Sequence, residues 1–182
     1  MSIISSTDAV RRVLIVGSGG SGKSTLARQL GARLELPVVH LDQHYFAPGW
    51  VESPPEEWAA TVEALIAEDA WVMDGNYGGT MEQRIGRADT VIFLDRSRWL
   101  CLWRVVSRWL RNLGHTRPDM APGCPERVEL AFVHYILAYP ATRRPGVLAR
   151  LAKADHARVH WLRSGRDVEA FLASVGAPAR GL

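Results

Sequence analysis

Five short, mostly apolar runs recur along the chain, and each is followed by a glycine or a charged residue. The runs cover residues 13–16, 38–41, 71–73, 91–94 and 159–162. Apolar runs of this length are typical of strands buried on both faces, as in parallel sheets. Between the runs, apolar residues recur three or four positions apart, which is the period of a helix. The pattern therefore predicts five strands that alternate with helices.

Helices are expected from residue 53 onward and at residues 23–34, 81–87, 97–113, 126–139, 146–154 and 167–175. The helix that starts near residue 53 has a strong start signal, because Ser53 can cap it and Glu56 can close a capping box. Trp58 lies on the apolar face of this helix and is expected in the core.

The helix at 97–113 carries two stripes of side chains. Its apolar stripe is expected to face the core and consists of Trp99, Trp103, Val106 and Leu110. A neighbouring basic stripe consists of Arg104, Arg108 and Arg111. Residues three and four apart share a helix face, so each stripe is continuous.

Strands that alternate with helices predict an α/β fold of three layers, in which helices cover both faces of a parallel sheet. The 182 residues fit a single domain, residues 1–182. In such sheets, ligands bind beyond the carboxyl ends of the strands. Four of the five predicted strands end at Gly17, Asp42, Asp74 and Asp95, so one edge of the sheet collects the candidate chemistry.

Composition and charge indicate the kind of ligand and the cellular compartment to expect. The net charge is +3, and many arginines fall between Arg96 and Arg166, which suits an anionic ligand. Two cysteines are too few for a disulfide framework and are expected to be free thiols in a reducing compartment. No apolar run reaches membrane-spanning length, so we expect a cytoplasmic protein with no membrane partner.

The strongest motif is Gly17-Ser18-Gly19-Gly20-Ser21-Gly22-Lys23-Ser24, which matches the phosphate-loop pattern Gly-x-x-x-x-Gly-Lys-[Ser/Thr] in full. Glycines let the backbone wrap so that successive N–H groups point at phosphate oxygens, and the following helix offers its positive end to the same anion. Lys23 is expected to reach the β- and γ-phosphates of ATP. These eight residues and Thr25 are the predicted nucleotide-binding set.

A phosphate loop of this kind predicts a bound Mg²⁺ with Ser24 as one ligand. Magnesium also needs a carboxylate, directly or through water. Asp74 is favoured, because Asp74-Gly75 leads into a loop that a substrate could reach. The other candidate, Asp95, can instead be read as part of the start of the next helix.

Three further stretches give the chain a family resemblance. They are His40-Leu41-Asp42 with Pro48-Gly49-Trp50, then residues 71–79 (WVMDGNYGG), then residues 116–120 (TRPDM) with 123–126 (GCPE). With these stretches the chain resembles the P-loop proteins similar to nucleoside-monophosphate kinases, and within them the family named DNA topology modulation proteins, which is related to adenylate kinase. The resemblance covers residues 12–175.

The resemblance implies a strand order of 2-3-1-4-5, a helical lid at about residues 104–145 and an acceptor-binding segment at about residues 42–70. Adenylate kinases carry Asp-Gly-Phe-Pro-Arg after the third strand. This chain keeps Asp74-Gly75 and has Asn76-Tyr77-Gly78 in place of Phe-Pro-Arg. Two lid-side arginines four apart are matched here by Arg104 and Arg108.

Phosphoryl transfer requires positioning and neutralisation of charge on the transferring group, and lid arginines can supply both. The predicted catalytic arginines are Arg104, Arg108, Arg117, Arg143 and Arg144. The alternative for each is a solvated basic residue on a helix face.

The acceptor site is expected near Asp42, which could take a proton from an acceptor hydroxyl, orient the substrate or merely cap a turn. Asn76, Tyr77 and Arg84 are the further candidates for acceptor binding, and Trp50 could add an aromatic wall.

The leading hypothesis is an ATP- and Mg²⁺-dependent kinase that transfers the γ-phosphoryl group to a small acceptor, such as a nucleotide or a nucleoside. An alternative is a nucleic-acid-associated ATPase or regulator that affects DNA topology. It is supported by the basic helix, although the sequence holds no known nucleic-acid-binding signature. A third reading, a phosphate loop that binds nucleotide without catalysis, is disfavoured by the intact Lys23, Ser24 and Asp74.

Overall fold

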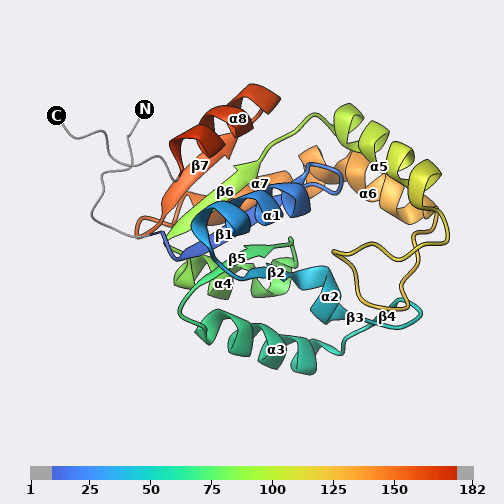
Figure 1. Ribbon diagram of the computed structural model, residues 1–182, viewed down its shortest axis with the longest axis horizontal. Helices are drawn as coiled ribbons and strands as arrows, with labels where there is room; N and C mark the ends of the chain where they lie inside the picture. Colours follow the sequence, from blue (N-terminus) through green and yellow to red (C-terminus); the bar gives the residue numbers. More distant parts are fainter. Residues whose placement is uncertain (1–9, 176–182) are drawn as a thin grey trace.

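The computed structural model describes residues 10–175, and its centre is a five-stranded parallel sheet (Figure 1). The strands are β1 (Arg12–Gly17), β2 (Val38–His40), β5 (Trp71–Asp74), β6 (Thr90–Leu94) and β7 (Arg158–Leu162). They lie in the order β2-β5-β1-β6-β7. All five predicted strands are present, each within one or two residues of its expected bounds.

A second, two-stranded sheet was not predicted from the sequence. It is the antiparallel hairpin of β3 (Phe46–Ala47) and β4 (Val51–Glu52). Because β3 and β4 belong to the hairpin, the third, fourth and fifth strands of the parallel sheet are labelled β5, β6 and β7. Counted along the chain within the parallel sheet alone, the spatial order of its strands is 2-3-1-4-5.

The helices are α1 (Lys23–Leu34), α2 (Leu41–Tyr45), α3 (Pro55–Ala67), α4 (Met81–Arg87), α5 (Arg98–Asn112), α6 (Leu130–Thr142), α7 (Arg144–Leu151) and α8 (Gly165–Ser174), with one turn of 3₁₀ helix at Gly78–Thr80. The predicted helix at 126–139 begins only at Leu130. The chain from residue 113 to residue 129 is therefore a longer connection than expected.

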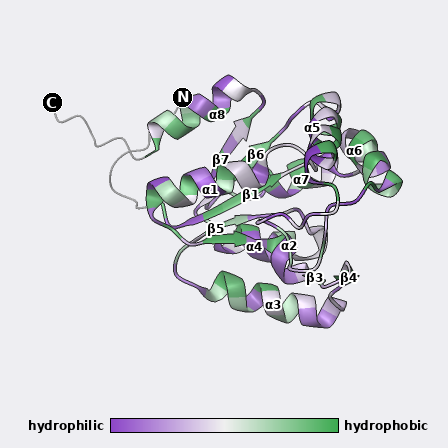
Figure 2. Ribbon diagram, turned by 45° about the vertical axis from the view of Figure 1, so that its right-hand side comes forward, coloured by the Kyte–Doolittle hydropathy of each residue, from purple (hydrophilic) through white to green (hydrophobic). Residues whose placement is uncertain are grey.

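The alternation of side chains along β1 shows how the sheet makes two cores. Leu14 and Val16 pack on one side, against α3, α4 and α7. Val13 and Ile15 pack on the other side, against α1 and α8. Figure 2 shows the central strands as largely hydrophobic, whereas the outer helices alternate between hydrophobic and hydrophilic residues. The predicted three layers are thus present, because the central strands β5, β1 and β6 bury both of their faces.

The start of α3 differs from the expected capping box. Pro54 is the N-cap residue, Pro55 begins the helix, and no side chain caps it. Ser53 instead donates its backbone N–H to the carbonyl oxygen of Tyr45 at 2.9 Å, which ties it to the base of the β3–β4 hairpin. Trp58 is buried in the core as predicted.

The apolar stripe of α5 does not face the core, and this prediction was wrong. Trp99 and Trp103 are exposed, whereas Cys101, Val105 and Trp109 form the buried face of the helix. The reason is a competing apolar row at a spacing of four, which packs against Ile136 of α6. Pattern alone could not decide between two apolar rows on one helix.

The connection between α5 and α6 is folded onto the β3–β4 hairpin. Gly49 donates its N–H to the carbonyl oxygen of Gly123 at 2.9 Å, and the Trp50 indole donates to that of Pro125 at 3.0 Å. A small apolar cluster accompanies these hydrogen bonds and consists of Met120, Ala121 and Cys124 with Phe46 and Trp50. We call residues 113–129 the strap, because they join α5 to the hairpin.

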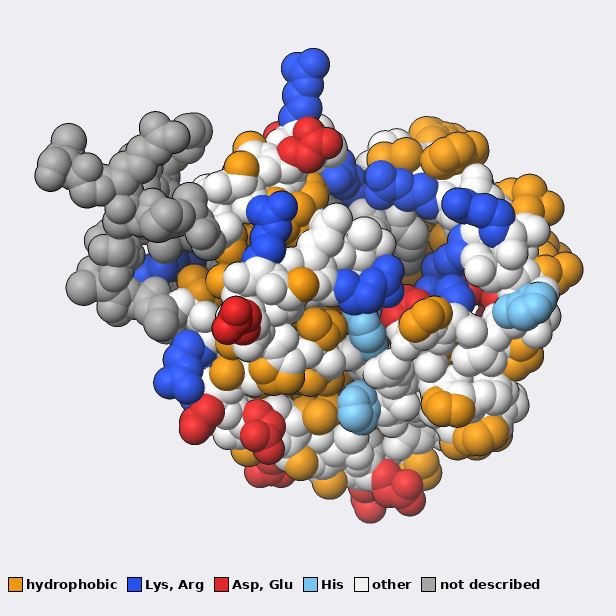
Figure 3. Space-filling model, viewed as in Figure 1, with side chains coloured by type: hydrophobic (Ala, Val, Ile, Leu, Met, Phe, Trp, Pro, Cys, Tyr) orange, Lys and Arg blue, Asp and Glu red, His pale blue; other side chains and the backbone are white. Residues whose placement is uncertain are grey.

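Both cysteines are buried free thiols, as predicted. No helix within residues 10–175 is long and apolar enough to cross a membrane. In the space-filling view, basic side chains gather beside α5 around a hollow, whereas acidic side chains lie mainly over α3 (Figure 3).

Two glycine substitutions test how α1 packs on the sheet. A Cβ at Gly31 would lie 2.2 Å from Cγ2 of Val38, whereas a Cβ at Gly86 of α4 meets nothing within 4 Å. We expect Gly31→Ala to destabilise the fold by about 1–3 kcal/mol through overpacking. Gly86→Ala, the matched control, should stabilise it by about 0.5–1 kcal/mol through lower chain entropy. Urea unfolding measures both, and equal effects of the two changes would contradict this packing.

Candidate active site

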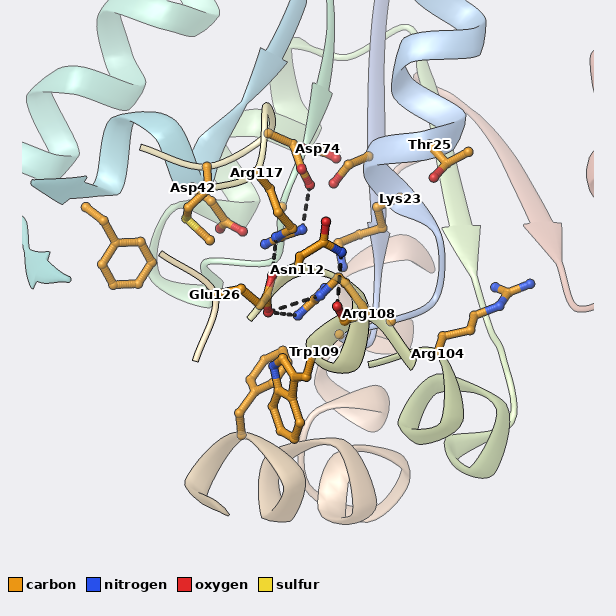
Figure 4. A pocket seen from close by; sticks show the side chains of 18 of the residues that line it. Lys23, Thr25, Asp42, Asp74, Arg104, Arg108, Trp109, Asn112, Arg117 and Glu126 are labelled. Carbon is orange, nitrogen blue, oxygen red and sulfur yellow. Dashed lines mark hydrogen bonds and ion pairs between the residues drawn. The ribbon is translucent and has the colours of Figure 1, made fainter. Parts of the chain in front are cut away.

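A cavity of about 800 Å³ lies at the carboxyl edge of the sheet. Its walls come from the loop after β1, the ends of β2 and β5, the β3–β4 hairpin, α5, the strap and α6. Figure 4 shows the side chains of Lys23, Asp74, Arg108 and Arg117 pointing toward one another inside it. The sheet thus brings together residues from distant parts of the chain, as expected for ligand sites in parallel sheets.

The phosphate loop joins β1 directly to α1, with Lys23 as the first helical residue. Gly20 and Gly22 have φ angles of 76° and 100°, which favour glycine. A Cβ at Gly20 would also lie 2.4 Å from the carbonyl oxygen of Cys101. These glycines therefore let the loop wrap closely against α5. Of the predicted nucleotide-binding residues, those that line the cavity are Gly19, Gly20, Gly22, Lys23, Ser24 and Thr25. Gly17, Ser18 and Ser21 are buried beneath them.

The Lys23 ammonium is held over the loop that precedes it. It donates to the carbonyl oxygens of Gly17 and Ser18, each at 3.0 Å. Burial lowers the pKa of Lys23, although the carboxylates of Asp74 and Asp42 act in the opposite direction. An ammonium that lacks a close carboxylate partner in a buried cavity is well placed to accept an anionic ligand.

Asp74 ends β5 and is buried, with its Oδ1 atom 3.0 Å from Nδ1 of His40. Its Oδ2 atom is buried and has no hydrogen-bond partner. Asp95, the other carboxylate considered, does not line the cavity. It pairs with both Nε and NH2 of Arg144, at 2.9 and 3.0 Å. Asp74 therefore lines the cavity together with Ser24, whereas Asp95 lies outside it.

The residues present fit a magnesium ion. Ser24 offers a hydroxyl and Asp74 a buried carboxylate oxygen without a partner, and oxygen atoms are the ligands that Mg²⁺ prefers. Asp119 of the strap lines the same cavity, and the Ser24 hydroxyl is near enough to lower the pKa of Asp119. Burial would raise the pKa of Asp119, but the Arg117 guanidinium and the Ser24 hydroxyl outweigh it and hold that pKa below its usual value. A third oxygen donor group thus stands beside the predicted ligands.

Asp42 lies on the acceptor side of the cavity, at the start of α2. Its Oδ1 atom accepts a hydrogen bond of 2.6 Å from the Tyr77 hydroxyl. Burial raises the pKa of Asp42, against the opposing effects of Tyr77 and Lys23. Tyr77 in turn packs its ring on Tyr45 and Trp58, with centroids 4.6 and 4.8 Å apart. The carboxylate is therefore held in place by an aromatic cluster.

Asn76 connects the loop after β5 to two other parts of the site. Its Oδ1 atom accepts the N–H of Gly17 at 3.0 Å, and its Nδ2 atom donates to the Tyr135 hydroxyl of α6 at 2.8 Å. Asn76 and Tyr77 both line the cavity, as predicted.

Arg84 was predicted to bind the acceptor, but it does not line the cavity. Its side chain is fully buried in α4, under the loop after β5. The guanidinium donates to the carbonyl oxygens of Gly75 at 2.9 Å, Tyr77 at 2.8 Å and Asn76. Burial lowers the pKa of Arg84 to about 9. Arg84 therefore shapes the loop that presents Asn76 and Tyr77, rather than meeting a ligand itself.

Three of the five predicted catalytic arginines line the cavity. Arg104 donates to the carbonyl oxygen of Ser21 at 3.1 Å. Arg108 and Arg117 share the buried carboxylate of Glu126, at 2.9 and 2.6 Å. Arg117 also pairs with Asp119 at 2.9 Å. The roles of Glu126 and Asp119 were not predicted from the sequence. Both lie in stretches 116–120 and 123–126, on which the family resemblance rests, and this was the signal available.

Arg143 and Arg144 stand apart from this group, because neither lines the cavity. Arg144 is held by its ion pair with Asp95, and Arg143 is exposed at the end of α6. The chain passes from α6 into α7 at these two residues.

Three solved kinase structures share the fold of this chain. A shikimate kinase from Acinetobacter baumannii, solved in complex with shikimate, aligns with a TM-score of 0.59 at 15% identity, covering 92% of each chain. A gluconokinase from Sinorhizobium meliloti aligns with a TM-score of 0.53 at 15% identity, covering 92% of this chain and 94% of that one. A shikimate kinase from Bacteroides thetaiotaomicron aligns with a TM-score of 0.51 at 14% identity, covering 91% and 95%.

No family model matches the chain, and neither does any curated protein sequence. The likeness to the three kinases therefore shows the fold, and it extends over nearly the whole chain.

Replacing Arg84 tests its role beneath the loop. We expect Arg84→Met to lower the free energy of unfolding by about 3 kcal/mol, because three carbonyl oxygens lose a charged donor. Arg87→Met on the same helix is the matched control. Arg87 is exposed and makes one such bond, so its loss should be below about 1 kcal/mol. Similar losses in the two variants, measured by urea unfolding, would show that Arg84 does not support the loop.

Proposed function

We propose that the protein is an ATP-dependent kinase that transfers the γ-phosphoryl group to a hydroxyl group of a small acceptor, with nucleosides among the candidates. The observation that carries this proposal is the position of Asp42, a half-buried carboxylate with a raised pKa in the same cavity as the phosphate loop. A carboxylate with a raised pKa is suited to take a proton at neutral pH. The fold shared with small-molecule kinases supports the same reaction class.

The acceptor side of the cavity favours a hydroxyl over a phosphate as the attacking group. Phe46, Trp50 and Tyr77 form its aromatic lining, and Asp42 adds negative charge. Two arginines that line this part of the cavity are already engaged. Arg117, whose charge acts on Asp42, pairs with Asp119 and Glu126, and Arg127 lies over the Trp50 ring, 4.9 Å from its centroid. A nucleoside monophosphate would need a cation for its phosphate, whereas an alcohol needs a base.

In the proposed reaction, the acceptor oxygen attacks the γ-phosphorus and its proton passes to Asp42. The bond from the γ-phosphorus to the bridging oxygen breaks, which leaves ADP and a phosphate monoester. Lys23, Arg108 and Arg117 lie where they can neutralise charge on the transferring group. Bound magnesium, held by Ser24 and Asp74, would add charge neutralisation at the β- and γ-oxygens. We further propose that residues 104–145 act as the lid that excludes water.

The nucleic-acid alternative is less well supported. The basic stripe of α5 is its main motivation, but that stripe is used within the cavity. Arg104 donates to the phosphate loop, Arg108 faces the cavity, where it pairs with Glu126, and Arg111 alone is exposed. These arginines are therefore not arranged as a free phosphate-binding surface of the kind that nucleic acids require.

A coupled ADP-release assay tests the proposal with panels of alcohols, nucleosides and nucleoside monophosphates. We expect magnesium-dependent turnover that is stimulated by a hydroxyl acceptor. Lys23→Ala should lower this turnover by about 10²-fold or more, because it removes charge stabilisation near the transferring group. Gln29→Ala, at an exposed position of the same helix that does not line the cavity, is the matched control. Turnover that no acceptor stimulates, or that survives in Lys23→Ala, would contradict the proposal.

The pH dependence tests Asp42. Its folded pKa lies above 3.8, so activity should fall as the pH drops through that raised pKa, where the base becomes protonated. Asp42→Asn should lower kcat by about 10²–10⁴-fold and remove this acid limb. The folded state also binds the proton more tightly than the unfolded state. Asp42 therefore costs stability as the pH rises through that window, and Asp42→Asn should raise the melting temperature at pH 8.

A variant that loses activity and stability together would point to a structural role for Asp42 instead. Tyr77→Phe serves as the comparison, because it removes the hydrogen bond to Asp42 and leaves the carboxylate in place.

A further inference from the structure

The outer face of α5 carries a row of exposed apolar side chains that nothing in the proposed function uses. The exposed fractions are 62% for Trp99, 65% for Trp103, 40% for Val106 and 82% for Leu110, and 59% for Leu113, the C-cap residue with which the strap begins. The hydrophobic side chains form the outer edge of the molecule at α5 in Figure 3, and Figure 1 shows no other element over it. Contiguous apolar patches of this kind mark interaction sites on soluble proteins.

The spacing of the row is that of a coiled-coil seam. Successive members are four, three, four and three residues apart, which is the a/d pattern of a heptad repeat over two heptads. In this pattern the seam positions of one helix pack against those of another helix. The spacing therefore favours another helix as the occupant of this face.

The positions that flank the seam carry no charge. They are Leu100, Leu102, Ser107 and Trp109. Flanking positions normally set the choice of partner through their charges, and like charges there would disfavour self-pairing. An uncharged flank permits two copies of the same helix to meet without repulsion.

A membrane surface is less well matched to this face. An interfacial helix needs basic residues that can reach lipid headgroups. Arg104 and Arg108 instead point into the cavity, where they are bound to Ser21 and Glu126. Arg98 lies over the Trp99 ring, 5.1 Å from its centroid. Arg111 is exposed, but its Nε donates to the carbonyl oxygen of Ser107 in the same helix, so the basic stripe leaves a single exposed cation.

We propose that α5 pairs with α5 of a second copy of this chain, in an antiparallel arrangement about a two-fold axis near Val106. Trp99 and Leu113 are each seven residues from Val106, so the axis places Trp99 against Leu113 of the partner subunit. Trp103 and Leu110 are three and four residues from Val106, so the same axis places Trp103 close to Leu110 of the partner subunit. Each large indole then faces a smaller aliphatic side chain, and the two helix dipoles oppose each other favourably.

The exposed apolar area of this face is large enough for a specific dimer interface. Two tryptophans, two leucines and a valine at these exposed fractions present on the order of 600 Å² per copy. Two copies would bury on the order of 1,200 Å², which is at the lower end of the range for specific interfaces. The dimer is therefore expected to be concentration-dependent rather than permanent.

Light scattering coupled to size-exclusion chromatography tests the pair with the full chain at about 1–200 μM. We expect twice the monomer mass at the upper end of this range. Leu110→Glu should weaken the association by about 100-fold or more, because the substitution would bury one unpaired carboxylate from each copy in the interface. Val51→Glu, an equally apolar and exposed position on β4, should leave the dimer intact. Circular dichroism checks that both variants are folded.

Disulfide trapping tests the orientation. The native thiols Cys101 and Cys124 are buried, so they do not compete. A mixture of Trp99→Cys and Leu113→Cys chains should form a mixed disulfide, whereas neither variant alone should cross-link.

Four outcomes would overturn the proposal. They are a monomer at every concentration, a dimer that persists in Leu110→Glu, cross-linking of Trp99→Cys with itself, and a monomer that sediments with anionic lipid vesicles through this face. None of these results depends on kinase activity, so the dimer can fail while the proposed function stands.

Discussion

The buried carboxylate of Glu126 holds the two sides of the cavity together. It accepts from Arg108 of α5 and from Arg117 of the strap, so one anion neutralises two guanidinium groups. A buried carboxylate needs such partners, because an unpaired buried charge is costly. Through this pairing the strap is fixed over the phosphate loop, Asp119 is placed beside Ser24, and the hairpin that carries Trp50 is drawn in with it. The pairing of the Glu126 carboxylate with these two arginines thus determines how the strap and the hairpin enclose the cavity.

The cavity collects buried charges that a fold built only for stability would avoid. Burial lowers the pKa of Lys23 and raises that of Asp42, so each charged form is held at a cost. One oxygen of Asp74 is buried without a partner. Unsatisfied groups of this kind are expected at functional sites, where stability gives way to ligand binding. Their convergence at the carboxyl edge of the sheet is what the proposed phosphoryl transfer requires.

The phosphate loop, all five strands of the parallel sheet and most of the helices could be predicted from the sequence. Apolar runs such as residues 91–94 and the glycine pattern at 17–24 carry local signals that do not depend on the rest of the chain. The role of Arg84 could not be predicted, because an arginine near a glycine-rich loop can face a ligand or the backbone equally well. The same limit applies to Glu126, whose partners are distant in sequence.

The sequence by itself determined the alternation of strands and helices, the phosphate loop, and the edge of the sheet at which Asp42 and Asp74 lie. The first two depend on neighbouring residues. The third depends on the rule that the carboxyl ends of parallel strands meet at one edge of the sheet. Only the tertiary structure decided which arginines reach the cavity and which row of α5 is buried. Both outcomes depend on competition among long-range partners. Arg144 forms an ion pair with Asp95. Val105 and Trp109 are buried and Trp99 and Trp103 are exposed, because α6 packs against one apolar row of α5 and leaves the other exposed.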